Sequence, residues 1–220
     1  MASYDEVLKT VYLVRHGQSE HNIAPIYQSQ DVRLSSEGRE QASLIAERVS
    51  DLDIDTLIAS PLPRAMETAQ IIGQVIGKEL ITTDVLVERI TPSFIEGKPY
   101  EDAESNKVWR EWEANFYTPG ARIADGENYE NYILRVDKAL EMFNNESGKS
   151  LLVVSHGGFI RAIAARVALG NLLTPELMKK FNNTVGIENT GITVLKYRAG
   201  FEDDAKWRLW SYNDHSHLTK

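Results

Sequence analysis

Short apolar runs alternate with longer amphipathic segments along the 220-residue chain. Three runs have the length and apolar character of buried strands: 11–15, 56–59 and 151–154. Four segments place apolar residues on one side of a helix: 36–49, 63–76, 129–143 and 159–169. This alternation predicts an α/β fold, a three-layer sandwich in which a mainly parallel sheet carries helices on both faces.

The apolar pattern near the C-terminus predicts further strands, which would give the sheet both parallel and antiparallel members. Residues 186–187 and 192–197 have strand character and are separated by a turn at 188–191, and 207–212 is the last strand candidate. A third strand is also expected within 80–86. The strands near the C-terminus are expected to add an antiparallel member to the sheet.

The segment from about 88 to 125 interrupts the alternation. It contains several prolines and two tryptophans, Trp109 and Trp112, on an expected helix at 100–116. The segment is too short to build a hydrophobic core of its own. We therefore expect one domain over 1–220, with an insertion at about 88–125 that covers one end of the sheet and forms part of a substrate pocket.

Composition excludes several classes of protein. The net charge of −8 and the lack of a basic run argue against a nucleic-acid partner. No apolar run approaches the roughly 20 residues that span a bilayer, so no membrane partner is expected. The absence of cysteine excludes disulfides and thiolate chemistry, and the acidic N-terminus lacks a secretory signal, which favours a cytoplasmic protein.

Arg15, His16 and Gly17 follow the first apolar run directly. Gly17 allows a sharp turn and a close approach to a ligand. Open α/β sheets bind ligands at the carboxyl ends of their strands. A fork-shaped cation beside a possible nucleophile therefore suggests phosphoryl chemistry, although such a pair alone is more often a salt-bridged loop.

Two other strand ends carry similar groups. Arg64 lies in the first turn of the helix expected at 63–76, where a cation opposes the helix dipole, unless it simply pairs with Glu67. His156 and Gly157 follow the most apolar strand and precede another helix, whose free backbone N–H groups favour an anion. Two His-Gly turns after two buried strands favour one shared anion site.

Acidic and metal-binding candidates are fewer. Glu88, near the end of the third expected strand, would serve as a general acid if burial or a bound anion raised its pKa; the alternative is a surface pair with Arg89. His215 and His217 have a spacing that resembles a metal site, but few suitable carboxylates lie nearby. A turn in the tail is the favoured interpretation, and no metal site is predicted.

Taken together, these motifs resemble the histidine phosphatase superfamily, the phosphoglycerate-mutase-like proteins. The resemblance extends over nearly the whole chain and rests on an ordered set of motifs: Arg15-His16-Gly17, Ser60-Pro61-Leu62-Pro63-Arg64-Ala65 with Thr68-Ala69, Glu88, Ser155-His156-Gly157 and the tail 213–218. The chain departs from the family in two places. Gln18 stands where Glu is frequent, and the stretch 88–97 is one residue longer than usual, which makes Glu96 a competitor of Glu88 for the role of acid.

The resemblance implies a two-step transfer without metal or other cofactor. His16 would attack phosphorus and form a phosphohistidine that water then hydrolyses. Glu88 would protonate the leaving oxygen. The remaining candidate site residues would bind the phosphate: Arg15, Asn22, Gln28, Arg64, His156 and Gly157.

Hydrolysis of small phosphomonoesters is the favoured function, with a small phosphorylated metabolite as partner. The alternatives are a cofactor-dependent phosphoglycerate mutase and a non-catalytic protein of the same fold that binds phosphorylated ligands. Substrate choice would depend on the loop at 23–33 and on the insertion. Four cations are candidates for a second anionic group of the substrate, the alternative being that all four are solvated: Arg33, Lys98, Lys107 and Arg110. The sequence predicts neither the physiological substrate nor the oligomeric state.

Overall fold

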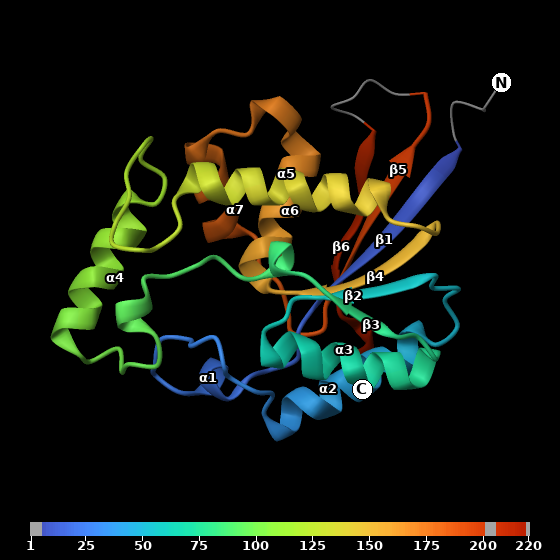
Figure 1. The fold of residues 1–220 in the computed structure, drawn as a ribbon, viewed down its shortest axis with the longest axis horizontal. Helices are drawn as coiled ribbons and strands as arrows, with labels where there is room; N and C mark the ends of the chain where they lie inside the picture. The colour runs from blue at the N-terminus through green and yellow to red at the C-terminus, as the bar shows by residue number, and fades with distance from the viewer. Residues whose placement is uncertain (1–5, 201–205, 219–220) are drawn as a thin grey trace.

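The computed structural model describes residues 6–200 and 206–218 and contains one six-stranded sheet (Figure 1). The strand order is β3-β2-β4-β1-β5-β6. The strands are β1 (Val7–Arg15), β2 (Thr56–Ala59), β3 (Leu80–Thr82), β4 (Ser150–Ser155), β5 (Ile192–Arg198) and β6 (Trp207–Asp214). Strands β3, β2, β4 and β1 are parallel, and β5 is antiparallel to both β1 and β6, which confirms the mixed, mainly parallel sheet.

Helices cover both faces of this sheet. They are α1 (Glu20–Ile23), α2 (Ser36–Val49), α3 (Pro63–Ile76), α4 (Ala103–Asn115), α5 (Tyr129–Asn145), α6 (Gly157–Leu169) and α7 (Pro175–Thr184). Figure 1 shows α2 and α3 on one face and α5, α6 and α7 on the other. Within the described residues, no helix is long and apolar enough to cross a membrane.

The alternation of side chains along each strand builds the two cores. In β1, Val11 and Leu13 pack with α5 and α6, whereas Val14 packs with α2 and α3. Because this part of β1 is covered on both faces, residues 11–14 are all apolar rather than alternating with polar residues. The expected three-layer α/β fold is confirmed.

Several expected elements differ from the observed ones. The third strand is shorter than expected: β3 ends at Thr82, and the 3-10 helix η1 (Asp84–Leu86) follows, capped by the Thr83 side chain. The prediction of a strand at 186–187 is wrong, because this described segment has no strand pairing. The Ile187 carbonyl accepts a hydrogen bond from the Arg15 guanidinium instead. Helices α1 and α7 were not expected, although Thr174 and Pro175 form a regular N-terminus for α7.

The segment 88–125 contains the 3-10 helix η2 (Ser93–Ile95) and α4, which extends beyond the carboxyl ends of the strands (Figure 1). Helix α4 starts three residues later than the sequence suggested, at the Asp102 cap. Trp112 and Phe116 of this segment are buried with Tyr132 and Phe159, which lie on α5 and α6. The segment therefore shares the core of the helices beside it.

Candidate active site

The carboxyl ends of β1, β2 and β4 lie at the same level of the sheet. Arg15 is in register with Ser155, and Ala59 is in register with Val154. The residues that immediately follow these strands therefore meet at one edge. The rings of His16 and His156 have their centroids 5.1 Å apart there, with an angle of 60° between their planes.

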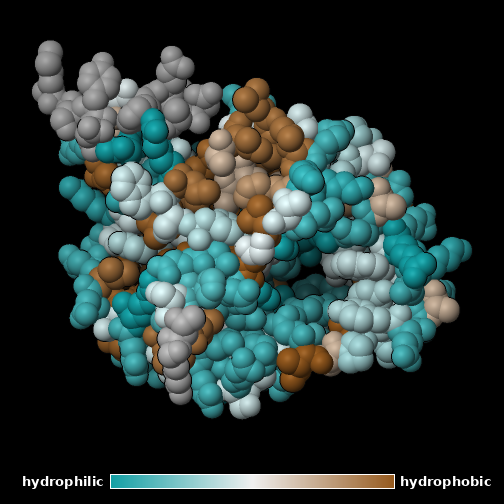
Figure 2. All heavy atoms as spheres, turned by 180° about the vertical axis from the view of Figure 1, so that it is seen from behind, coloured by the Kyte–Doolittle hydropathy of each residue, from teal (hydrophilic) through white to brown (hydrophobic). Residues whose placement is uncertain are grey.

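A cavity of about 1160 Å³ opens at this edge. Figure 2 shows a hollow on the side of the molecule where α4 lies. Seven of the eight candidate site residues line this cavity: Arg15, His16, Asn22, Gln28, Arg64, Glu88 and Gly157. His156, the eighth, is fully buried and is not a lining residue, but its ring lies against that of His16.

The turn after β1 fixes both the orientation and the protonation of His16. Its Nδ1 lies 2.7 Å from the Gly17 carbonyl oxygen, which can only accept, so Nδ1 carries the proton of the neutral ring and Nε2 is unprotonated. Burial, followed by the charges of Arg64 and Arg15, holds the pKa of His16 well below its usual 6.5. His16 is therefore a neutral imidazole at neutral pH, with Nε2 able to act as a nucleophile.

Two glycines lock this turn against α2. A Cβ on Gly17 would lie 2.4 Å from the Gly38 carbonyl oxygen, and a Cβ on Gly38 would lie 2.0 Å from the Gln18 carbonyl oxygen. Neither position has room for a side chain, because both obstructing atoms belong to the backbone. The Gly17 N–H also donates to the Thr68 hydroxyl of α3 at 3.1 Å, so helices on one face of the sheet hold the turn in place.

Arg64 and Arg15 lie beside His16 without a carboxylate partner among the described ion pairs. Arg64 is 3% exposed, and its strongest bond is a 3.3 Å contact with the Ser29 carbonyl. Burial lowers the pKa of Arg64 to about 10. The Nε atoms of both arginines are buried without a partner in the described part of the chain. The alternative pairing of Arg64 with Glu67 is wrong, because Glu67 binds Arg39 at 2.6 Å.

His156 presents one nitrogen to the protein and keeps the other unbonded. Its Nε2 lies 2.8 Å from the Ser60 hydroxyl, whereas Nδ1 is buried and has no partner among the described residues. Burial, followed by the charge of Arg64, holds the pKa of His156 well below 6.5. A neutral histidine with an unused nitrogen can still exchange a proton or a hydrogen bond with a ligand.

Glu88 is held at the N-terminus of α6 by two backbone N–H groups. Oε2 accepts from Gly158 and Oε1 from Arg89, each at 2.9 Å. A Cβ on Gly158 would lie 2.4 Å from Oε1, so the second glycine of the motif makes room for this carboxylate. The alternative surface pair of Glu88 with Arg89 is wrong, since Arg89 binds Glu113 at 2.7 Å.

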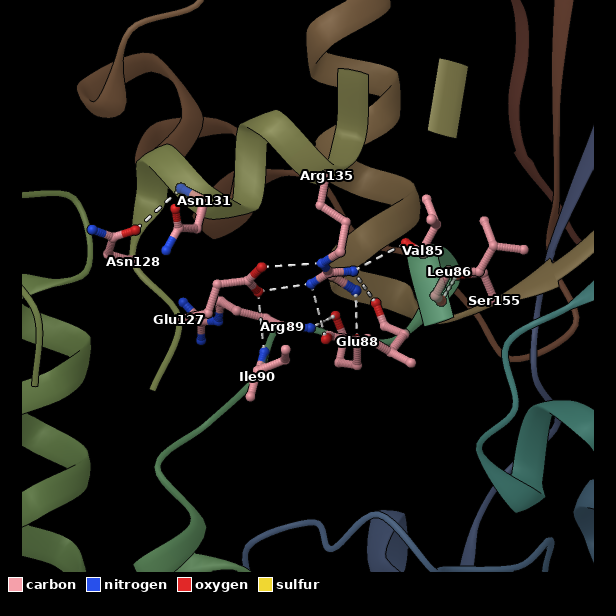
Figure 3. Close-up of polar contacts among 12 residues, drawn as sticks. Val85, Leu86, Glu88, Arg89, Ile90, Glu127, Asn128, Asn131, Arg135 and Ser155 are labelled. Atoms are coloured by element: carbon pink, nitrogen blue, oxygen red, sulfur yellow. Dashed lines mark hydrogen bonds and ion pairs between the residues drawn. The ribbon is translucent and has the colours of Figure 1, made fainter. Parts of the chain in front are cut away.

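Arg135 of α5 supports the backbone around Glu88, as Figure 3 shows. Its guanidinium donates to the carbonyls of Val87 at 2.5 Å and of Glu88 at 3.2 Å. Glu127, which is 7% exposed, accepts from the same guanidinium at 2.7 Å and 3.0 Å. Sequence reasoning missed this pair, because residues eight positions apart that straddle a helix N-terminus give no periodic signal.

The remaining predicted site residues, Asn22 and Gln28, also line the cavity. Asn22 accepts the Ser19 N–H and hydroxyl with its Oδ1, which leaves its NH₂ group for a ligand. Gln28 donates to the Ser19 hydroxyl at 2.9 Å. Glu96, the competitor of Glu88, also lines the cavity but binds Gln30 at 3.0 Å.

The four cations proposed to bind a second anionic group of the substrate do not all line the cavity. Arg110 lines the cavity, whereas Arg33, Lys98 and Lys107 are not among the residues that line it. Arg161 and Asn182, which sequence reasoning missed, do line it. The argument that singled out Arg64, a cation in the first turn of a helix, does not extend to Arg161, because Arg161 is the fifth residue of α6.

The C-terminal tail packs on the loop behind His16. Asn189 donates its amide to the His16 carbonyl at 2.9 Å, and the Thr190 hydroxyl lies 2.9 Å from His217 Nε2. His217 Nδ1 is 3.2 Å from the Arg48 guanidinium. Within the described residues, no group of three His, Cys, Asp or Glu side chains is placed to hold a metal ion.

Comparisons with known proteins agree with this architecture. A family model of the histidine phosphatase superfamily (branch 1) matches residues 11–214. A probable phosphoglycerate mutase GpmB of Photorhabdus laumondii is 33% identical over 211 residues, with 94% of each protein covered. A second protein of that description, from Yersinia pestis, is 31% identical over 213 residues, also with 94% of each covered.

Solved structures share the fold. A putative alpha-ribazole-5'-P phosphatase from Escherichia coli superposes with a TM-score of 0.79 at 20% identity, covering 94% of this chain and 97% of that one. The phosphoserine phosphatase of Entamoeba histolytica, solved in complex with 3-phosphoglyceric acid, gives a TM-score of 0.73 at 26% identity, with 96% and 99% covered.

Proposed function

The chain belongs to the histidine phosphatase superfamily (branch 1), and on this premise we propose that it is a phosphatase of small phosphomonoesters that needs no metal. Hydrolysis would proceed through a phosphohistidine on His16. The observation that carries the proposal is the bond between His16 Nδ1 and the Gly17 carbonyl, which leaves Nε2 unprotonated. The guanidinium groups of Arg15 and Arg64, whose buried Nε atoms have no partner among the described residues, lie beside this histidine.

The first step forms a bond between His16 Nε2 and phosphorus while the bond to the leaving oxygen breaks. Arg15 and Arg64 neutralise the equatorial oxygens as their charge redistributes. The Asn22 and Gln28 amides, the Gly157 N–H and the unbonded Nδ1 of His156 complete the set of phosphate contacts. This role would explain why two buried arginines have no carboxylate partner among the described ion pairs.

Glu88 gives its proton to the leaving oxygen and takes one from the water that attacks the phosphohistidine. The second attack breaks the P–N bond and releases inorganic phosphate. Glu88 is favoured over Glu96 because two backbone N–H groups fix its carboxyl beside the N-terminus of α6, within the phosphate-binding edge.

A phosphoglycerate mutase is the second candidate, because curated relatives over 30% identical carry that description. A mutase has to keep water from its phosphohistidine until a second substrate arrives. Hydrolysis is favoured here because the cavity of about 1160 Å³ is much larger than a phosphate and leaves room for water. The phosphoserine phosphatase of Entamoeba histolytica has been solved with 3-phosphoglyceric acid and, as a mutant protein, with phosphoserine.

The test is phosphate release from p-nitrophenyl phosphate in excess chelator, with wild type and His16→Asn. Asparagine can keep a donor toward the Gly17 carbonyl but has no counterpart of Nε2. We expect turnover by the wild type, a loss of at least about 10⁴-fold in the variant, and a phosphoryl group trapped on His16 by rapid acid quench and mass spectrometry.

His215→Ala is the matched control, because His215 lies in the tail and does not line the cavity. Its activity should equal that of the wild type. Activity that the chelator abolishes, or that His16→Asn retains, would refute the phosphohistidine route. Incubation with 3-phosphoglycerate and a bisphosphoglycerate primer separates the two candidates, because a mutase yields the isomer and a phosphatase yields inorganic phosphate.

A further inference from the structure

Helix α6 carries two arginines in contrasting surroundings. Each guanidinium nitrogen of Arg166 has a partner, since it binds Asp137 through two bonds of 2.7 and 3.2 Å and the Gly170 carbonyl at 2.7 Å. Arg161 makes one long bond of 3.4 Å to the Val185 carbonyl, and its buried Nε has no partner in the described part of the chain. Only Arg161 lines the cavity.

Arg161 lies close to the phosphate-binding edge. Arg15 donates to the Ile187 carbonyl at 2.6 Å, and Arg161 to the Val185 carbonyl two residues earlier. Positions two residues apart in a chain are separated by at most about 7 Å. Burial lowers the pKa of Arg15, and the nearby charge of Arg161 lowers it further.

Asn182 of α7 adds a second unsatisfied group to the same wall. Its amide NH₂ donates to the Tyr117 hydroxyl at 2.7 Å, which fixes the side chain, and its buried Oδ1 has no partner among the described residues. The wall therefore offers a guanidinium that needs an anion and an amide oxygen that needs a donor. We call Arg161 and Asn182 the α6–α7 subsite.

We propose that the α6–α7 subsite recognises a carboxylate on the substrate through Arg161, and a neighbouring hydroxyl or ammonium group through Asn182 Oδ1. The inference rests on the proposed function and names its substrate class: phosphorylated short-chain acids that carry a hydroxyl or amino group. A carboxylate fits better than a second phosphate, because one guanidinium matches one negative charge and its fork matches two carboxylate oxygens.

The test compares 3-phosphoglycerate with glycerol 3-phosphate, which has a hydroxymethyl group in place of the carboxylate. Affinities are measured by calorimetry on His16→Asn protein, which is not expected to turn either ligand over. We expect the acid to bind at least tenfold more tightly. Adding Arg161→Gln should reduce this preference by about tenfold to a hundredfold, the range expected for one charge-assisted hydrogen bond.

Lys179→Gln is the matched control, since it removes a positive charge from the exposed surface of α7, outside the cavity lining. The preference should then remain. Arg161→Lys, which keeps the charge without the fork, should give an intermediate preference and guards against misfolding of the glutamine variant. An unchanged preference in Arg161→Gln, or no preference when Arg161 is present, overturns the subsite.

The same ligands separate this inference from the proposed function. If the wild type hydrolyses no phosphomonoester but the binding preference depends on Arg161, the subsite stands and the phosphatase proposal fails. If the wild type hydrolyses both ligands with equal kcat/KM and the preference is absent in binding, the phosphatase proposal stands and the subsite fails.

Discussion

Arginines line the cavity on two sides, and their surroundings differ. On one side, Arg89 of the segment 88–125 and Arg135 of α5 are each paired with a glutamate at 2.7 Å. At the edge of the sheet, Arg15 and Arg64 have buried Nε atoms without partners in the described part of the chain. A buried arginine with a carboxylate partner has its charge compensated within the protein. A buried arginine without such a partner destabilises the folded state until an anion binds. We infer from this contrast that Arg89 and Arg135 stabilise the fold, whereas Arg15 and Arg64 bind a ligand.

The largest expected effect comes from removing an arginine that is paired with a glutamate. Arg135→Met would leave the Glu127 carboxylate buried without its ion pair and would free three backbone carbonyls of the Glu88 loop. Breaking a buried pair from one side destabilises a protein by about 3–5 kcal/mol. We expect a loss of this size in the free energy of unfolding, measured by urea denaturation.

The double variant Arg135→Met with Glu127→Gln should recover part of that loss, because the stranded charge is removed as well. A single variant as stable as the wild type would show that the paired arginine is not structural.

A second test removes an arginine that has no carboxylate partner among the described ion pairs. Arg64→Met is expected to lower kcat/KM about 10²- to 10³-fold, the range found for one donor to a developing charge. Its free energy of unfolding should stay the same or rise, because a desolvated cation is replaced by an apolar side chain of similar length. Urea denaturation and phosphate release on the same preparation measure both effects. A loss of stability as large as that of Arg135→Met would contradict the distinction.

The third and smallest effect concerns pH. His16 and His156 have folded-state pKa values well below 6.5, so below pH 6.5 the unfolded chain binds protons that the folded protein does not. Their contribution is neutral above pH 6.5, and stability is lost as the pH falls from 6.5 toward the folded-state pKa values. The slope contributed by each histidine should grow from about 0.7 kcal/mol per pH unit at pH 6.5 toward about 1.4 kcal/mol per pH unit at lower pH.

His16→Asn should make this decline shallower by the contribution of one histidine, which urea denaturation at pH 6.5, 6.0 and 5.5 measures. His215→Ala is again the control. An unchanged decline in His16→Asn would mean that His16 is already protonated in the folded protein.

Much of the fold could be predicted because local pattern and tertiary burial agree. The helices at 36–49 and 63–76 and the strand at 56–59 have the bounds expected from their periodicity. The exceptions are decided by contacts distant in the sequence. Residues 186–187 look apolar enough for a strand, but Ile187 packs against Gly157 and gives its carbonyl to Arg15.

The candidate site was predictable to a similar extent, for a related reason. Arg15, His16 and His156 follow parallel strands, whose ends meet wherever such strands pair. Arg135 and Asn182 lie within helices and reach the cavity only through the packing of α5 and α7. No spacing along the chain encodes that packing, so the supporting residues and the α6–α7 subsite needed the structure.

The position of β1 in the sheet has a consequence for how the protein is made. Both neighbours of β1 come from the last third of the chain: β4 begins at Ser150 and β5 at Ile192. At a synthesis rate of about 5–20 residues per second, β1 waits on the order of ten seconds or more for its first partner. During that interval, β1, which ends one residue before His16, has no strand edge to join, and chaperones have time to bind it. His16, the first histidine to be synthesised, can reach its folded surroundings only after nearly the whole chain has left the ribosome.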